Sequence, residues 1–195
     1  MNKIIIYITL AVFLLGLGAS WVLQKANSSY DIPLVKSVPV FEFKTQDKIL
    51  FSNKDLMGKI TVLDFMFTLC AGPCPVMTNN MTLLYRDYEN VDNAQFVSIT
   101  VDPSNDNEDV LKQYSIANGV NDNRWQFLTS DIDSIKKLKR DGFMLYADEL
   151  PQGHAIKFIL IDQNGKIRKY YDGTDKASMA VLRNDLNKLI KEINK

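Results

Sequence analysis

The sequence of 195 residues contains only two cysteines and a single histidine. Its 23 basic and 23 acidic side chains balance, so the formal net charge is zero. The chain has no excess of basic side chains that would favour nucleic acid as a partner. It also has no acidic tail that would favour a cationic partner. A chain of this length is expected to form one domain with a large hydrophobic core. The two cysteines are therefore not needed as a disulfide that stabilises the fold.

The N-terminal segment has no charged side chain from Ile4 to Leu23 and is mostly apolar. Such a run is just long enough to span a bilayer. A cleavable signal peptide is the alternative, but its apolar core would be shorter, and residues 17–20 form only a weak cleavage site. We favour an uncleaved, single-pass anchor over residues 1–25. Because Lys3 precedes the apolar run, we expect the rest of the chain on the periplasmic or extracytoplasmic side.

The same segment has no cysteine, which excludes a lipoprotein anchor. Both cysteines lie instead in one short turn, Cys70-Ala71-Gly72-Pro73-Cys74-Pro75. The turn follows a strand pattern and precedes a helical one. Pro75 suits the first position of a helix, so we predict that the helix begins there with Cys74 beside its cap. Both sulfurs then face a small cavity at the positive end of the helix dipole, which favours thiolate over thiol.

Two thiolates at such a turn suit a soft metal ion, Cu(I) above all, or a reversible disulfide. The alternative is a pair of inert, buried cysteines, which would not need a turn rich in glycine and proline. His154 lies just before the apolar run 155–161. Its imidazole would add a nitrogen donor, giving a set that copper accepts in either oxidation state. The alternative for His154 is a surface residue without a role.

The hydrophobic pattern predicts an α/β fold in which parallel βαβ units are followed by a β-hairpin and a helix. We interpret this order as a thioredoxin-like sandwich with a β-hairpin insertion, preceded by a transmembrane helix. The tether covers residues 26–37 and the domain covers 38–195. The predicted strands are 38–43, 48–51, 60–66, 95–101, 125–128, 155–161 and 166–171, and the predicted helices are 75–90, 106–118, 131–140 and 175–194.

Binding sites in such open sheets form beyond the carboxyl ends of the strands, where the cysteine turn lies. His154 precedes a strand instead of following one. It therefore reaches the same edge only if that strand runs antiparallel to the strand at 60–66. The predicted fold has this orientation.

From residue 38 to its end, the sequence resembles the SCO/SenC family in the segments 67–75, 98–103 and 153–165. The resemblance implies membrane-tethered copper proteins of thioredoxin fold that help to build the dinuclear copper centre of cytochrome c oxidase. It implies Cys70, Cys74 and His154 as ligands of Cu(I) or Cu(II). The implied partners are the oxidase subunit that holds this centre, other copper chaperones and thioredoxin-like reductants.

One departure from the family lies between the cysteines. Many members carry an acidic residue there, whereas this chain has Ala71-Gly72-Pro73, which leaves one negative charge fewer near the metal. Asp102 matches a family position, and a plain turn residue before Pro103 is the alternative. Three methionines near the turn could be soft donors, but we favour core packing for them. They are Met66, Met77 and Met81.

The sequence leaves three functional hypotheses. The first is a copper metallochaperone that uses Cys70, Cys74 and His154. The second is a thiol–disulfide reductase in which Cys70 and Cys74 are the catalytic pair and His154 is not needed. The third, a peroxidase with one cysteine as its peroxidatic thiolate, is disfavoured by the proline-flanked pair and by the lack of other polar catalytic residues.

Overall fold

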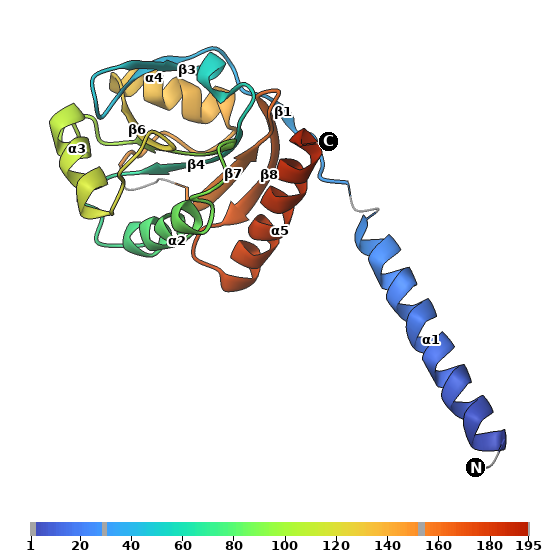
Figure 1. Ribbon diagram of the computed structural model, residues 1–195. Coiled ribbons are helices and arrows are strands. Elements are labelled where there is room, and N and C mark those ends of the chain that lie inside the picture. Colours follow the sequence, from blue (N-terminus) through green and yellow to red (C-terminus); the bar gives the residue numbers. More distant parts are fainter. Residues whose placement is uncertain (1–2, 29–30, 152–154, 195) are drawn as a thin grey trace. The chain divides into compact units, whose positions relative to one another are not determined.

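The computed structural model describes residues 3–28, 31–151 and 155–194 of the chain. These residues form two compact units that divide between Ile32 and Pro33. The first unit is one helix, α1 (Lys3–Ser28), shown at the blue end of Figure 1. Its window Ile5–Val22 has a mean hydropathy of 2.2. By length and composition α1 could cross a membrane, and a signal sequence has the same properties.

The second unit is built on one mixed sheet with the strand order β1-β8-β7-β4-β5-β6-β2-β3. At its centre β4 runs parallel to β5, and β5 runs parallel to β6. On the other side β4 pairs with an antiparallel β7. The described strands are β1 (Lys36–Ser37), β2 (Glu42–Thr45), β3 (Leu50–Ser52), β4 (Ile60–Met66), β5 (Ala94–Thr100), β6 (Trp125–Thr129), β7 (Lys157–Ile161) and β8 (Lys166–Asp172).

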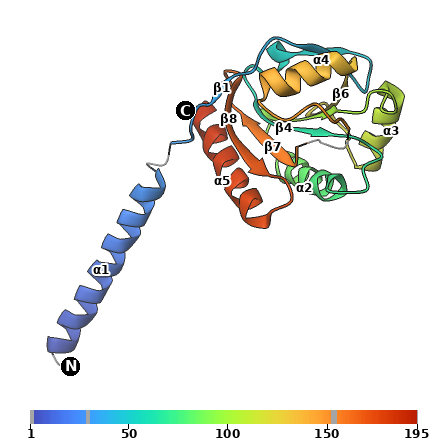
Figure 2. The same ribbon diagram turned by 180° about the vertical axis from the view of Figure 1, so that it is seen from behind.

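Helices cover both faces of this sheet. Helices α2 and α5 lie over one face and α4 lies over the other, as Figures 1 and 2 show from opposite sides. The helices of this unit are η1 (Asn53–Leu56, 3₁₀), α2 (Cys74–Asp87), α3 (Glu108–Ala117), α4 (Ile132–Lys137), η2 (Leu138–Gly142, π) and α5 (Lys176–Ile193).

The central strand β4 is buried along its whole length. Because side chains alternate across a sheet, its residues divide between the two faces. Leu63 and Phe65 join the hydrophobic core on the face that α4 covers, together with Ile135. The alternate side chains of β4, which include Asp64, therefore point to the face that α2 covers.

The predicted thioredoxin-like α/β architecture is confirmed, including the hairpin β2–β3 and the antiparallel direction of the strand after residue 154. Several bounds differ from the sequence prediction, among them the first hairpin strand, which is Glu42–Thr45 instead of 38–43. The sheet includes Lys36–Ser37, which the prediction assigns to the tether, because these residues pair with the edge strand β8. The predicted helix at 131–140 ends in the π-helical turn η2, in which the buried Lys139 lies.

Candidate metal centre

The turn between β4 and α2 carries both cysteines. Helix α2 begins at Cys74, one residue earlier than predicted, because the carbonyl of Pro73 already accepts the backbone N–H groups of Val76 and Met77 at 3.1 Å. On the other side of the turn, the N–H of Cys70 donates to the carbonyl of Phe67 at 3.3 Å. The chain thus curls back, and both sulfur-bearing residues line one cavity of about 440 Å³.

The two cysteines differ in exposure. Cys70 is half-buried, whereas Cys74 is only 2 % exposed, and no disulfide joins the two. Burial raises the pKa of the Cys74 thiol, and the adjoining Cys70 sulfur raises it further, although a hydrogen bond from the backbone of Phe67 opposes both effects. The thiolate predicted at the helix N-terminus is therefore disfavoured at Cys74, because burial raises the pKa of its thiol. Cys70 is the accessible sulfur of the pair.

A fully buried carboxylate holds the start of the cysteine turn. Asp106 accepts hydrogen bonds from the hydroxyl of Thr68 at 2.5 Å and from its backbone N–H at 3.1 Å. It also accepts the hydroxyl of Thr100, at the end of β5, at 2.6 Å. These bonds tie the segment just before Cys70 to the neighbouring strand. These bonds therefore fix the position of the first residues of the turn.

A second buried carboxylate, Asp64, lies beneath the site. It faces Ser98 in the register between β4 and β5 and is hydrogen-bonded to it, but its Oδ1 has no hydrogen-bond partner. Burial raises the pKa of Asp64 to about 7, which the Ser98 bond partly counteracts. The negative charge of Asp64 also raises the pKa of Cys74. The dithiol thus shares its surroundings with a carboxyl group that titrates near neutrality.

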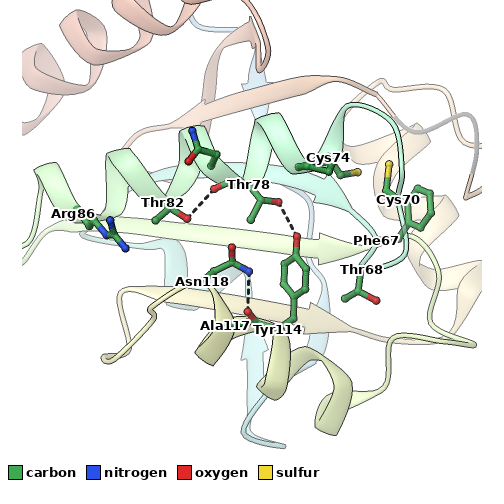
Figure 3. A pocket seen from close by; sticks show the side chains of 12 residues that line it. Phe67, Thr68, Cys70, Cys74, Thr78, Thr82, Arg86, Tyr114, Ala117 and Asn118 are labelled. Carbon is green, nitrogen blue, oxygen red and sulfur yellow. Dashed lines mark hydrogen bonds between the residues drawn. The ribbon is translucent and has the colours of Figure 1, made fainter.

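Helices α2 and α3 form the walls of the cavity. The hydroxyls of Thr78 and Tyr114 meet across it at 2.9 Å, as Figure 3 shows. Burial raises the pKa of Tyr114, and the bond to Thr78 lowers it in part. Figure 3 also shows the two cysteines at one end of the cavity and Arg86 at the other. A polar groove therefore leads away from the thiols along α2.

His154, the third predicted ligand, lies outside the described residues. Within residues 3–28, 31–151 and 155–194, no three His, Cys, Asp or Glu side chains gather in a way that could hold a metal ion. The predicted core packing of the three methionines is confirmed, since Met66, Met77 and Met81 are 2 %, 1 % and 0 % exposed. The described part of the chain thus contributes two sulfur donors.

Asp102 has the geometry of a turn residue. Its carboxylate accepts the side-chain amide of Asn105 at 2.8 Å, and its carbonyl accepts the N–H of Asp106 at 2.9 Å. The residues that support the cysteine turn are instead Asp106 and Asp64, which the sequence analysis missed. Two signals were present in the sequence: a lone acidic residue inside the apolar strand 60–66, and a second acidic residue close behind Asp102.

The donor set fits a soft ion better than a hard one. Two thiol sulfurs line one cavity end, and the carboxylates of Asp64 and Asp106 are buried, with Asp106 already engaged by two threonines. Thiolate ligands favour Cu(I) or Zn²⁺ over Mg²⁺ or Ca²⁺. This donor set lies on a dithiol turn between a strand and a helix, beside the parallel strands at the centre of the sheet. The class of protein is therefore a thioredoxin-like protein with a soft-metal or redox dithiol.

The chain belongs to the SCO1/SenC family, whose sequence model matches residues 34–191. A relative from Bacillus subtilis, "SCO1 protein homolog", is 33 % identical over 151 residues, which cover 73 % of this chain and 77 % of the relative. A relative from Rickettsia conorii, "SCO2-like protein RC0895", is 30 % identical over 207 residues, which cover 94 % of this chain and 96 % of the relative.

Solved structures show the same fold. A SCO1/SenC family lipoprotein from Bacillus anthracis matches with a TM-score of 0.73 and 37 % identity, covering 80 % of this chain and 96 % of that one. This chain has no cysteine in its N-terminal segment. BsSco, described as a member of the Sco family of cytochrome c oxidase assembly proteins with a disulfide switch, matches with a TM-score of 0.73 and 27 % identity, covering 83 % and 98 %.

Copper is present in a solved structural neighbour. ScoI of Bradyrhizobium japonicum, solved with copper bound, matches with a TM-score of 0.65 at 22 % identity, covering 80 % of this chain and 99 % of that one. At that identity the likeness shows the shared fold.

Proposed function

We propose that this protein is a copper metallochaperone that carries its ion on Cys70, Cys74 and His154. The copper is delivered to the dinuclear copper centre of cytochrome c oxidase, or the same dithiol prepares the thiols of that centre. The observation that carries the proposal is that two cysteine side chains line one end of one cavity, on a turn fixed by Asp106. Membership of a family with cytochrome c oxidase assembly proteins supports the recipient.

The topology supports His154 as the third ligand. Strand β7 begins at Lys157 and runs antiparallel to β4, with Ile159 opposite Leu63. The start of β7 therefore lies at the sheet edge where β4 ends and the cysteine turn begins. His154 is three residues before Lys157, and three residues span at most about 10 Å.

The exposure of the two sulfurs suggests how the cargo enters and leaves. Cys70 is accessible and can meet an incoming or departing ion first, whereas Cys74 is covered by protein. Both thiols must lose their protons to act as ligands, so copper binding releases protons and strengthens with pH. Because burial raises the pKa of Cys74, loss of its proton keeps copper binding dependent on pH above neutrality.

Helix α1 suits an N-terminal anchor that keeps the domain at a membrane on its periplasmic or extracytoplasmic side. In that place the chain can meet a membrane-bound oxidase subunit. Other copper chaperones would supply the ion, and thioredoxin-like reductants would keep the dithiol reduced in an oxidising compartment. Nothing in the charge balance favours nucleic acid as a partner.

An anaerobic Cu(I) titration of the reduced full chain in detergent tests the ligand set. We expect about one copper per chain for wild type, loss of tight binding in Cys70→Ser and Cys74→Ser, and weaker binding with an altered Cu(II) spectrum in His154→Ala. Thr82→Val changes the same cavity away from the sulfurs and is expected to keep wild-type stoichiometry. A wild-type chain that takes up no copper would defeat the proposal.

Thiol–disulfide exchange is the second candidate, and the unequal exposure of the two sulfurs favours it. The Cys70 thiolate would attack a partner disulfide and form a mixed disulfide while one partner thiolate leaves. The Cys74 thiolate would then attack Cys70 and release the second partner thiolate. Two electrons pass to the partner, and a thioredoxin-like reductant restores the dithiol. The disulfide switch described for BsSco supports this candidate. We expect the protein to reduce a model disulfide, and we expect His154→Ala to reduce it at the wild-type rate.

A further inference from the structure

The groove between α2 and α3 continues well beyond the two thiols. The groove follows α2 from Cys74 to Arg86, which lie twelve residues apart in the helix. Because a helix rises about 1.5 Å per residue, the two ends of the groove lie about 18 Å apart. Between them the lining is uncharged and polar, with hydroxyls and amides from Thr78, Thr82 and Asn118. Among the described residues that line the cavity, Arg86 is the only charged one.

Arg86 differs from the other arginines of the chain. Each of the other four forms an ion pair with a carboxylate, whereas Arg86 forms none with any residue of the described ranges. The four pairs are Arg124–Asp122, Arg140–Asp141, Arg168–Asp162 and Arg183–Asp87. The exposed Arg86 side chain lies at the far end of the groove, where a Cβ built on Gly119 would be 3.5 Å from its Nη2. An exposed cation thus lies at the end of a polar groove, and no carboxylate of the described residues pairs with it.

We propose that this groove is the docking site for a cysteine-containing segment of a partner protein, and that Arg86 binds a carboxylate of that segment. The inference rests on the proposed function, because the partner cysteine must meet Cys70. An extended peptide advances about 3.3 Å per residue. A span of about 18 Å therefore places the partner's acidic residue five or six positions from its cysteine. Arginine suits this role because its planar guanidinium pairs with carboxylates.

Hydroxyls and amides along the groove suit the backbone of such a segment, since they can donate and accept hydrogen bonds without selecting side chains. The selectivity then comes from the two ends: a sulfur at the thiols and a negative charge at Arg86. Because Arg86 is exposed, its contribution is modest, about two- to five-fold in rate or affinity, and it weakens as salt is added.

Exchange kinetics with synthetic peptides test this proposal on the reduced full chain in detergent. Each peptide carries one cysteine activated as a mixed disulfide with thiopyridine, and a Glu or a Gln five positions away. The Cys70 thiolate attacks the peptide sulfur, and thiopyridine leaves and is followed by its absorbance. At low salt, wild type is expected to react about two- to five-fold faster with the Glu peptide than with the Gln peptide.

Variants distinguish an effect of the charge at the end of the groove from a general effect of the charge of the protein. Arg86→Gln is expected to abolish the preference for Glu, and Arg86→Glu to reverse it towards a peptide with Lys at that position. Arg140→Gln removes the same charge on the other face of the sheet and is expected to keep the preference. A peptide with Glu next to its cysteine is expected to gain nothing.

Two results would overturn the proposal: equal rates for the Glu and Gln peptides, or an advantage that does not depend on the spacing. The Cu(I) titration distinguishes this failure from failure of the metallochaperone function. Arg86→Gln is expected to bind one copper as wild type does. A normal titration with no peptide preference would therefore reject the docking site alone.

Discussion

The carboxylate of Asp106 accepts both the hydroxyl and the backbone N–H of Thr68, at 2.5 and 3.1 Å, across 38 residues of sequence. Thr68 lies two residues before Cys70. The first residues of the cysteine turn are thus held by a residue that follows β5, the strand parallel to β4. A turn tied down in this way has less conformational freedom to lose when its sulfurs bind copper.

Replacing Asp106 by Asn should weaken this support. An amide keeps one acceptor oxygen but turns an NH₂ group towards donors, so we expect a loss of about 2 kcal/mol of unfolding free energy. Urea unfolding of the apo protein measures it. Asp102→Asn is the matched control, because Asp102 lies in the nearby turn and is expected to change stability by less than about 0.5 kcal/mol. Equal effects of the two variants would contradict the role of Asp106.

Asp64 should make stability depend on pH below neutrality. Burial raises its folded pKa from 3.8 to about 7, so between these values the folded state binds more protons than the unfolded state. Stability therefore falls as pH rises from about 4 to 7, by at most about 4 kcal/mol. Asp64→Asn should flatten this dependence and be more stable than wild type at pH 8. Urea midpoints at pH 5 and 8 measure both effects, and parallel profiles would refute them.

Lys139 should produce the opposite trend at alkaline pH. It is fully buried, its ammonium donates to the carbonyl of Tyr146, and burial lowers its pKa from 10.5 to about 8. Above pH 8 the unfolded state binds more protons, so stability rises towards pH 10. Lys139→Met should lose this rise, whereas Lys137→Met, at an exposed position of the same helical segment, should keep it. Thermal unfolding between pH 8 and 10 checks the difference.

The two cysteines should react at different rates. With Cys74 2 % exposed and its pKa raised by burial, its thiolate is scarce and covered, whereas Cys70 is half-buried. We expect iodoacetamide to modify Cys74→Ser at nearly the wild-type rate and Cys70→Ser at least about ten-fold more slowly. Mass spectrometry of quenched samples locates the label. Equal rates in the two variants would show that the native fold does not protect Cys74.

Much of this protein follows from the order of its residues. The alternation of apolar strands and helices predicts the thioredoxin-like sheet, because hydrophobic periodicity reports which face of an element is buried. The Cys70–Cys74 turn also predicts a soft-metal or redox site locally, since its sulfurs are only four positions apart. The direction of β7 relative to β4 followed from the predicted topology, and the strand register confirms it.

The tertiary structure decided what surrounds that dithiol. Burial, which is set by residues distant in sequence, raises the pKa of the Cys74 thiol. The pairing of β4 with β5 brings Asp106 to Thr68 and places Ser98 opposite Asp64. The packing of α3 beside α2 creates the groove that ends at Arg86. Local pattern cannot give these relationships, because desolvation and charge depend on three-dimensional distance and not on separation along the chain.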